Sequence, residues 1–255
     1  MNSEAEPRVA FVWVWLPGAD TPVVAGRLDR EADRVTFTYG RSYLARADAI
    51  ALYLPELPLQ TGRIDPAPMR IAGCIADGGP DAWGQRVILN RRVARRDLET
   101  AALTPLTFLL ESGSDRVGAL DFQESATTYV PRVGPSTSLD DLAAAADHVE
   151  RGIPLSPALD EALLHGSSIG GARPKALLRD GDRSLIAKFS STTDPYSVVK
   201  GEFIAMELAA RAGLSVPPVR LTSALGKDVL LVERFDRADG TRRRGMVSAL
   251  TVLGL

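Results

Sequence analysis

Two serines, an adjacent glycine pair and a lysine lie within fourteen residues, in the stretch HGSSIGGARPKALL at 165–178. A bound phosphate needs several backbone N–H donors that converge on it, and glycine permits the close approach and positive φ angles of such a nest. Gly170 and Gly171 provide that freedom. The spacing is not that of a Walker A loop or of a dinucleotide fingerprint, since a strand is expected to follow instead of a helix. The stretch is a candidate phosphate loop, and a plain turn is the alternative.

A lysine and a glutamate follow this loop at an informative spacing. Lys188 lies in IAKFS, and Glu202 lies fourteen residues later in KGEFIAMELA. In the N-lobe of protein kinases a glycine-rich loop precedes a strand lysine that contacts the α- and β-phosphates, and a helix glutamate orients that lysine. The sequence therefore suggests a nucleotide site, with a solvated strand lysine as the alternative interpretation of Lys188.

Short strands and one amphipathic helix would position these residues. Strands are expected at 175–180 and 184–190, on either side of a Gly181-Asp182 turn, and again near 218–223 and 228–233. Residues 198–214 predict a helix closed by Gly213. This order places Lys188 on a strand and Glu202 on the helix that follows it.

The first half of the chain has a different pattern. Residues 9–16, 23–28 and 34–39 predict a small antiparallel sheet, and the proline- and glycine-rich residues 51–80 predict irregular structure. Helices are expected at 81–98, 104–112 and 138–152, with Asp81, Thr104 and Ser138 as N-caps, and 127–138 is the best candidate for a linker. The sequence therefore predicts an α+β fold.

Composition narrows the class of protein. The 255 residues suit one large domain or two smaller ones, and 30 basic against 32 acidic residues give a net charge of -2, which does not favour a nucleic-acid or membrane surface. Cys74 is the single cysteine, so no intrachain disulfide can form. The N-terminus is acidic and its apolar run is far too short to span a bilayer. We expect a soluble protein of the cytoplasm.

Three other groups of residues invite a functional interpretation. His148 and His165 are the only histidines and have no cysteine nearby, so a zinc site is not expected. Asp77 and Asp81 lack the regular alternation of oxygen ligands that a calcium loop needs, and helix capping explains them better. The cluster RRRG at 242–245 suggests an exposed hairpin tip more than a nucleic-acid contact.

The sequence resembles the HipA toxins, which are kinases of bacterial toxin–antitoxin modules. The resemblance lies in SSIGGARPKALL (167–178), FIAMELAARAGLSVPPVRL (203–221), LLVERFDR (230–237) and MVSALTVLGL (246–255). FTYGRSYLARADAIALYLPELPL (37–59) and DGGPDAWGQRVI (77–88) resemble the N-terminal domain of the family. The resemblance implies a small β-rich domain at 1–125, followed at 126–255 by a kinase-like N-lobe with an antiparallel sheet and helix and by the start of an incomplete C-lobe.

The resemblance also implies ATP and Mg²⁺ as cofactors of the intact family, and it assigns residues to the nucleotide. The loop residues would enclose the phosphates, Lys188 would contact the α- and β-phosphates with Glu202 beside it, and the hinge residues would lie against the adenine. The loop residues are Gly170, Gly171, Ala172, Arg173, Pro174 and Lys175, and the hinge residues are Glu233, Arg234 and Phe235.

Ser168 stands where family members carry an autophosphorylated serine. A phosphate there adds nearly two negative charges, so it should repel the phosphates of ATP or pull the loop outward toward arginines. The resemblance thus implies an inhibitory phosphorylation site. Ser167 is a rival acceptor, and local turn capping by both serines is the simpler alternative.

The catalytic residues of a kinase are missing from this sequence. No aspartate-histidine-lysine-asparagine run and no HRD string occurs, so the catalytic loop and the Mg²⁺ ligands are absent. The apolar run SALTVLGL ends the chain without a polar tail and would need a partner surface. We expect a C-terminally truncated or frameshifted kinase, or the first part of a split one, with no phosphotransfer by this chain alone.

Two hypotheses about function follow. In the first, the chain is a fragment of a HipA-type serine/threonine kinase that, when intact, phosphorylates a protein of translation. A HipB-like helix-turn-helix antitoxin would neutralise it, and that antitoxin, not this chain, would contact DNA. In the second, the chain is a non-catalytic binding module that pairs with the antitoxin or with a separately encoded kinase lobe.

Overall fold

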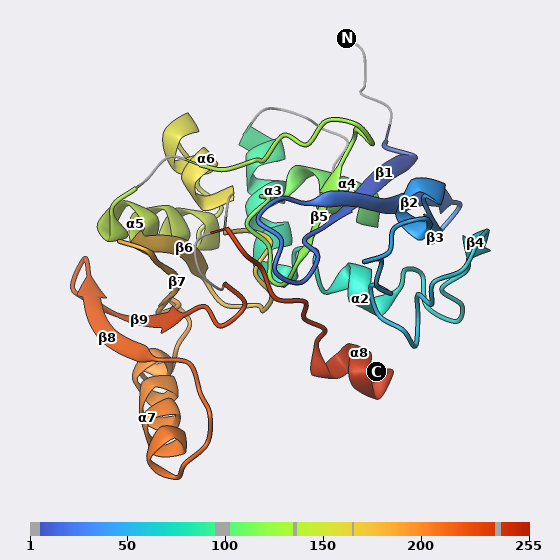
Figure 1. Cartoon of the computed structure of the whole chain (residues 1–255). Helices are drawn as coiled ribbons and strands as arrows, with labels where there is room; N and C mark the ends of the chain where they lie inside the picture. The colour runs from blue at the N-terminus through green and yellow to red at the C-terminus, as the bar shows by residue number, and fades with distance from the viewer. Residues whose placement is uncertain (1–5, 95–102, 135–136, 165, 238–240) are drawn as a thin grey trace. The chain divides into compact units, whose positions relative to one another are not determined.

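The computed structural model describes residues 6–94, 103–134, 137–164, 166–237 and 241–255. These residues form two compact units that interleave along the chain (Figure 1). Unit 1 draws on residues 1–80, 101–132 and 236–255, and unit 2 draws on 81–100 and 133–235. Both units combine helices with an antiparallel sheet, which confirms the α+β class. The division into domains at 1–125 and 126–255 stays a prediction, because compact units of a structure do not by themselves define the domains of a family.

Unit 1 is built on an antiparallel sheet with the strand order β4-β3-β2-β1-β5. Its strands are β1 (Val9–Val14), β2 (Val23–Glu31), β3 (Arg34–Tyr39), β4 (Arg63–Ile64) and β5 (Leu120–Gln123). The meander of the first three strands lies close to the expected bounds. A shift of register between Val12 and Trp13 marks a bulge in β1, and such bulges increase the local twist of a strand.

The core of unit 1 explains one glycine in the sheet. Gly26 lies on β2 opposite Tyr39, and a Cβ built there would stand 2.3 Å from the Thr38 carbonyl oxygen and 2.6 Å from the Phe37 ring. The missing side chain lets the Phe37 ring lie over the strand, where it packs edge to face against Tyr39 at 4.7 Å. The sequence analysis gave no reason to expect a glycine at position 26.

A fully buried arginine holds the end of one helix in unit 1. α4 (Pro105–Glu111) begins at the Thr104 cap, as expected. Past its last turn, Arg116 donates to the Leu109 carbonyl, to the Ser112 hydroxyl at 2.8 Å and to Asp121 Oδ1 at 2.6 Å. Burial lowers the pKa of Arg116 to about 10, and Asp121 opposes that effect. A buried charge of this kind is tolerated only because it is paired and hydrogen-bonded.

Three short helices complete unit 1: α1 (Arg41–Leu44), α2 (Gly73–Ala76) and α8 (Ala249–Leu253). Asp77 accepts hydrogen bonds from the Ser248 N–H at 2.7 Å and from the Thr251 hydroxyl at 2.8 Å, both in the first turn of α8. Its carboxylate therefore caps a helix distant in sequence, in accord with the capping interpretation. Leu250, Val252, Leu253 and Leu255 are exposed, as the apolar ending of the sequence suggested.

Unit 2 contains the second antiparallel sheet, with the strand order β6-β7-β9-β8. Its strands are β6 (Lys175–Asp180), β7 (Arg183–Phe189), β8 (Val219–Ala224) and β9 (Lys227–Glu233). Its helices are α3 (Ala82–Ala94), α5 (Leu139–Glu150), α6 (Pro157–Leu164) and α7 (Val198–Arg211). All these elements except α6 were expected. The predicted end of the first helix at 95–98 lies outside the described residues.

Alternation along the strands gives the second sheet two covered faces. Ala187, Val229 and Leu231 face a core that includes Trp83 of α3 and helices α5 and α6. Leu230 and Val232 face the opposite side and pack with Val199 of α7. Since Lys188 is adjacent to Ala187, its side chain emerges on the α7 face. This alternation decides where the candidate site lies.

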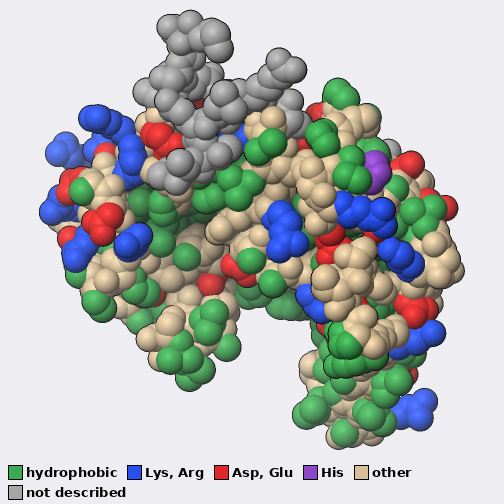
Figure 2. Space-filling view, turned by 180° about the vertical axis from the view of Figure 1, so that it is seen from behind, with side chains coloured by type: hydrophobic (Ala, Val, Ile, Leu, Met, Phe, Trp, Pro, Cys, Tyr) green, Lys and Arg blue, Asp and Glu red, His purple; other side chains and the backbone are tan. Residues whose placement is uncertain are grey.

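The outer surface of α7 is apolar. Ile204, Leu208 and the following Leu214 are each more than half exposed, and hydrophobic side chains gather over this part of the molecule (Figure 2, lower right). An exposed apolar helix face of this kind usually marks an interaction surface.

The predicted linker at 127–138 is partly packed, because Tyr129 and Arg132 both bond to Asp121. Its residues 135–136 lie outside the described residues.

Candidate functional site

The candidate loop folds over the α7 face of the second sheet. Gly171 has a φ of +109°, a backbone conformation that residues with a side chain rarely adopt, and a Cβ built there would lie 2.8 Å from Lys175 Nζ. Both glycines of the pair are exposed, whereas residues 166–169 before them are buried. Gly171 is therefore required by its backbone conformation, as the sequence interpretation assumed for this residue.

The start of α3 clamps both ends of the loop. Asp81 Oδ2 accepts a hydrogen bond from the Gly171 N–H at 2.6 Å, and the Trp83 N–H donates to the Gly171 carbonyl at 3.2 Å. The Trp83 indole donates to the Lys175 carbonyl at 2.9 Å. A Cβ on Gly170 would collide with the same Asp81 oxygen at 2.8 Å. The carboxylate expected to cap α3 thus occupies an N–H of the candidate phosphate loop.

Lys175 is the most unusual residue of the site. It is only 4% exposed, and its ammonium group makes no hydrogen bond within the described residues. The pKa of Lys175 is lowered to about 8, first by burial and then by the neighbouring Lys188, while Asp81 and Glu202 act in the opposite direction. Buried polar groups without a partner are rare in folded proteins, and they mark places where a ligand or a change of conformation supplies the partner.

The two lysines lie side by side. Lys175 of β6 is the direct antiparallel partner of Lys188 of β7, so both side chains point to the same face of the sheet. Lys188 Nζ forms a short hydrogen-bonded ion pair with Glu202 Oε1 of α7. Two ammonium groups therefore lie beside the loop, with Glu202 paired directly to one of them and Asp81 bonded to the Gly171 N–H. An anion that replaced Asp81 at this N–H would meet both ammonium groups.

The other loop residues have structural partners. Arg173 forms an ion pair with the nearly buried Asp194, and the Pro174 carbonyl accepts a hydrogen bond from the Phe189 N–H at 3.0 Å. Ala172 between them is exposed. These contacts anchor the second half of the loop to β7 and to the segment that leads into α7.

The hinge residues lie at the end of β9. Glu233 follows Leu230, the strand partner of Lys188, by three residues, which is about 10 Å along a strand. The N–H groups of Glu233 and Arg234 donate to the Pro218 and Ser184 carbonyls at 2.9 Å. Arg234 is buried, whereas Phe235 is 56% exposed. Phe235 is therefore the hinge side chain that is accessible to a planar ligand.

Ser167 and Ser168 are both fully buried, and neither hydroxyl has a hydrogen-bond partner within the described residues. They lie in tight turns in which the Ser167 N–H donates to the Leu164 carbonyl at 3.0 Å and the Ile169 N–H to the Gly166 carbonyl at 3.3 Å. Neither hydroxyl caps these turns. Ser168 could receive a phosphate only if the loop moved outward, and phosphorylation there stays a prediction.

The remaining candidates can be placed briefly. The described residues contain no group of three or more potential metal ligands, and His165 lies outside them. Arg242, Arg244 and Gly245 are exposed, and an antiparallel bridge joins Arg237 to Arg243, in accord with a hairpin tip. Arg243 differs from that prediction, because it stacks on the Trp15 ring at 3.5 Å. No helix in the described parts of the chain has the length and apolar character needed to cross a membrane.

Two features of the site escaped the sequence interpretation. Asp81 and Trp83 are ninety residues away from the loop they hold, and only the motif DGGPDAWG hinted at a role for them. The burial of Lys175 was also missed, because the first residue of a strand is usually accessible. Alternation along KALLRD could have placed Lys175 on the same face as Leu177, but not under the loop.

Comparison with known families gives two matches along the chain. Residues 14–123 match the family model described as HipA N-terminal domain, and residues 167–255 match the HipA-like C-terminal domain. The chain belongs to the HipA family. No curated protein matches it in sequence.

One solved structure of a HipA protein is similar in fold. It comes from Shewanella oneidensis MR-1 and is titled as a toxin–antitoxin system of HipA, HipB and its operator DNA. The TM-score is 0.62 at 20% sequence identity, over 96% of this chain. The chain spans 56% of the length of that HipA-complex chain. The comparison therefore supports the fold of this chain and does not bear on its activity.

Proposed function

We propose that this chain is the nucleotide-binding half of a HipA-like serine/threonine kinase toxin. The Lys188–Glu202 ion pair carries the proposal, because it joins β7 to α7 in the arrangement by which kinases hold the lysine that contacts the α- and β-phosphates. The glycine pair, the buried Lys175 and membership of the HipA family support it.

ATP fits the residues present. Its phosphates would satisfy the ammonium of Lys175 and would contact Lys188, and the N–H of Gly171 would exchange Asp81 for a phosphate oxygen. Phe235 would lie against the base. Mg²⁺ is left out of the proposal, because the sequence lacks the kinase motifs that carry its ligands. The proposal therefore includes nucleotide binding and no phosphotransfer by this chain alone.

The partners belong to the same proposal. The similar HipA structure is a complex with HipB and operator DNA, which supports a HipB-like helix-turn-helix antitoxin as the partner here. By family resemblance, an intact relative would phosphorylate a protein of the translation machinery in the cytoplasm. DNA contact would belong to the antitoxin, since the chain has no basic excess of its own.

A nucleotide titration tests the proposal. A fluorescent ATP analogue is titrated into the full chain, into Lys188→Met and into the control Lys227→Met, whose lysine pairs with Asp147 at 3.3 Å on the same unit. Lys188→Met should weaken binding by about tenfold or more, as expected for one charge-assisted contact, and Lys227→Met should match the wild type. Equal affinities of all three proteins would refute the proposed site.

A second function is favoured by one observation. The apolar outer face of α7, with Ile204 and Leu208, is exposed in the structure, and a binding module would use such a face to hold a kinase lobe or an antitoxin. Co-purification of the chain with each candidate partner, with Ile204→Glu and Leu208→Glu variants, tests this function. Partner binding by a chain that fails to bind nucleotide would favour the module over the kinase half.

A further inference from the structure

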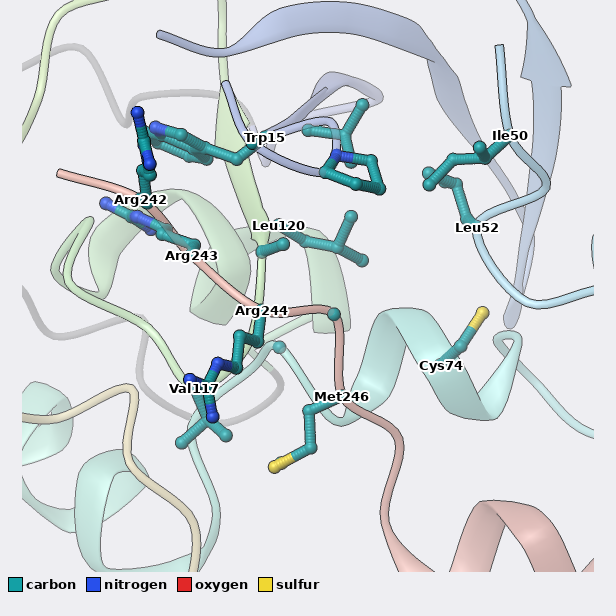
Figure 3. Close-up of a pocket in the computed structure, with 16 residues that line it drawn as sticks. Trp15, Ile50, Leu52, Cys74, Val117, Leu120, Arg242, Arg243, Arg244 and Met246 are labelled. Atoms are coloured by element: carbon teal, nitrogen blue, oxygen red, sulfur yellow. The ribbon is translucent and has the colours of Figure 1, made fainter. Parts of the chain in front are cut away.

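A cavity of about 470 Å³ lies within unit 1, in the volume range of sites for small molecules. Its walls come from segments far apart in the sequence: the end of β1 with the loop after it, residues 50 and 52, the region of α2, residues 117–120 and residues 242–246 (Figure 3). The nucleotide site uses none of these residues.

Most of the wall is apolar. Val14, Trp15, Cys74 and Ala119 line it and are themselves buried. Burial raises the pKa of the Cys74 thiol, and a hydrogen bond with Glu56 raises it further, so the thiol stays neutral at physiological pH. The wall therefore offers a ligand contact area but few hydrogen bonds, as in most small-molecule sites.

The charged groups of the cavity have a single sign. Among the described residues that line it, the charged ones are the consecutive arginines Arg242, Arg243 and Arg244. In Figure 3 their side chains lie on one side of the cavity, and Ile50 and Leu52 lie on the opposite side. Positive charge beside low-dielectric walls attracts and concentrates anions.

The three arginines are not equally engaged. Arg243 stacks on Trp15 and donates to the Ser114 carbonyl at 3.0 Å, and Arg242 contacts the exposed Asp20 at 3.3 Å. The Arg244 side chain makes no hydrogen bond or ion pair with any residue that the structure describes, and only its backbone is held, by the Asp236 carbonyl. A guanidinium fork without a partner is available for a carboxylate or phosphate.

We propose that this cavity binds a small organic anion, with its apolar body toward Ile50 and Leu52 and its carboxylate or phosphate on the arginine side. The apolar walls favour a small molecule over a peptide, because a peptide backbone would bury N–H and C=O groups that find no partners there. Arg244 would supply the free charge for recognition. This site goes beyond the proposed kinase function and does not depend on it.

Two probes of one shape test the proposal. Naphthalene-1-carboxylate and its neutral carboxamide are titrated calorimetrically into the full chain, into Arg244→Gln and into the control Arg70→Gln, an exposed arginine of the same unit that does not line the cavity. The carboxylate should bind once, about tenfold more tightly than the amide. Arg244→Gln should remove that difference, and Arg70→Gln should leave it unchanged. ATP should not displace the carboxylate.

Equal affinity of carboxylate and amide, or equal affinity of the two arginine variants for the carboxylate, would overturn the proposal. Absence of saturable carboxylate binding would overturn it as well, and saturable binding of an acidic peptide in its place would assign the arginines to a protein partner. Displacement of the carboxylate by ATP would assign the cavity to the nucleotide. Failure of the chain to bind ATP would refute the proposed nucleotide site, and it would leave the comparison of carboxylate with amide and of the two arginine variants unaffected.

Discussion

Replacement of Lys175 by methionine should stabilise the protein while it weakens nucleotide binding. The ammonium group of Lys175 is buried without a partner within the described residues and lies beside Lys188. Its pKa falls from 10.5 to about 8, and each pKa unit corresponds to about 1.4 kcal/mol, so charging this group costs the folded state about 3 kcal/mol. Methionine keeps the apolar stem and removes the charge.

The effect should depend on pH in a defined direction. At pH 7 the lysine is charged in both the folded and the unfolded chain, so the folded state carries the full cost. Between about pH 8 and pH 10.5 the folded state releases the proton while the unfolded chain keeps it, so the cost disappears as the pH rises. Lys175→Met should therefore gain about 2 kcal/mol of unfolding free energy at pH 7, and this gain should shrink toward pH 10.

Urea unfolding of the wild type and of Lys175→Met at pH 7 and pH 10 measures this gain. Lys200→Met is the matched control, because Lys200 is exposed and pairs with Asp228 at 3.2 Å, so its removal should give no gain. A Lys175→Met protein that is less stable than the wild type at pH 7, or whose gain is the same at both pH values, would refute the reasoning. Unchanged ATP affinity in the same variant would show that the buried charge does not serve the nucleotide.

Three further predictions concern other parts of the chain. Asp81→Asn keeps an acceptor for the Gly171 N–H but removes a charge that repels phosphate, so ATP should bind about fivefold more tightly, equivalent to about 1 kcal/mol at this exposed position; weaker binding would show that the carboxylate is needed to shape the loop. Ser168→Ala in a full-length relative should keep nucleotide binding and lose loop phosphorylation, and phosphopeptide spectra with unchanged occupancy would contradict this. Arg116→Ala should destabilise unit 1 by about 2–4 kcal/mol, because it removes a buried ion pair with Asp121 and the hydrogen bonds to Leu109 and Ser112, although Asp121 keeps its ion pair with Arg132; a loss under 1 kcal/mol in chemical unfolding would count against that.

Local patterns in the sequence predicted most of the elements and the polar pair of the site. The hairpin around Gly181, the helix with Glu202 and the Ser138 cap all follow from short-range rules, because alternation, turn residues and capping act over a few positions. Lys188 reaches Glu202 because strand alternation fixes the face of the sheet from which it emerges.

Long-range contacts were beyond the sequence. The clamp between Asp81 and Gly171, the burial of Arg116 and the arginine-lined cavity each join segments that only the folded chain brings together. The arginine run at 242–244 shows the difficulty clearly. The run suggested an exposed hairpin tip, and Arg242 and Arg244 are exposed, yet Arg243 lies against Trp15, which is more than two hundred residues earlier in the chain.

The structure of the chain with a non-hydrolysable ATP analogue tests the central claim most directly. We expect the phosphates beside Lys188 and Lys175, with the Gly171 N–H turned from Asp81 to a phosphate oxygen. An analogue bound elsewhere, or a loop and a Lys188–Glu202 pair unchanged at saturating nucleotide, would contradict the account.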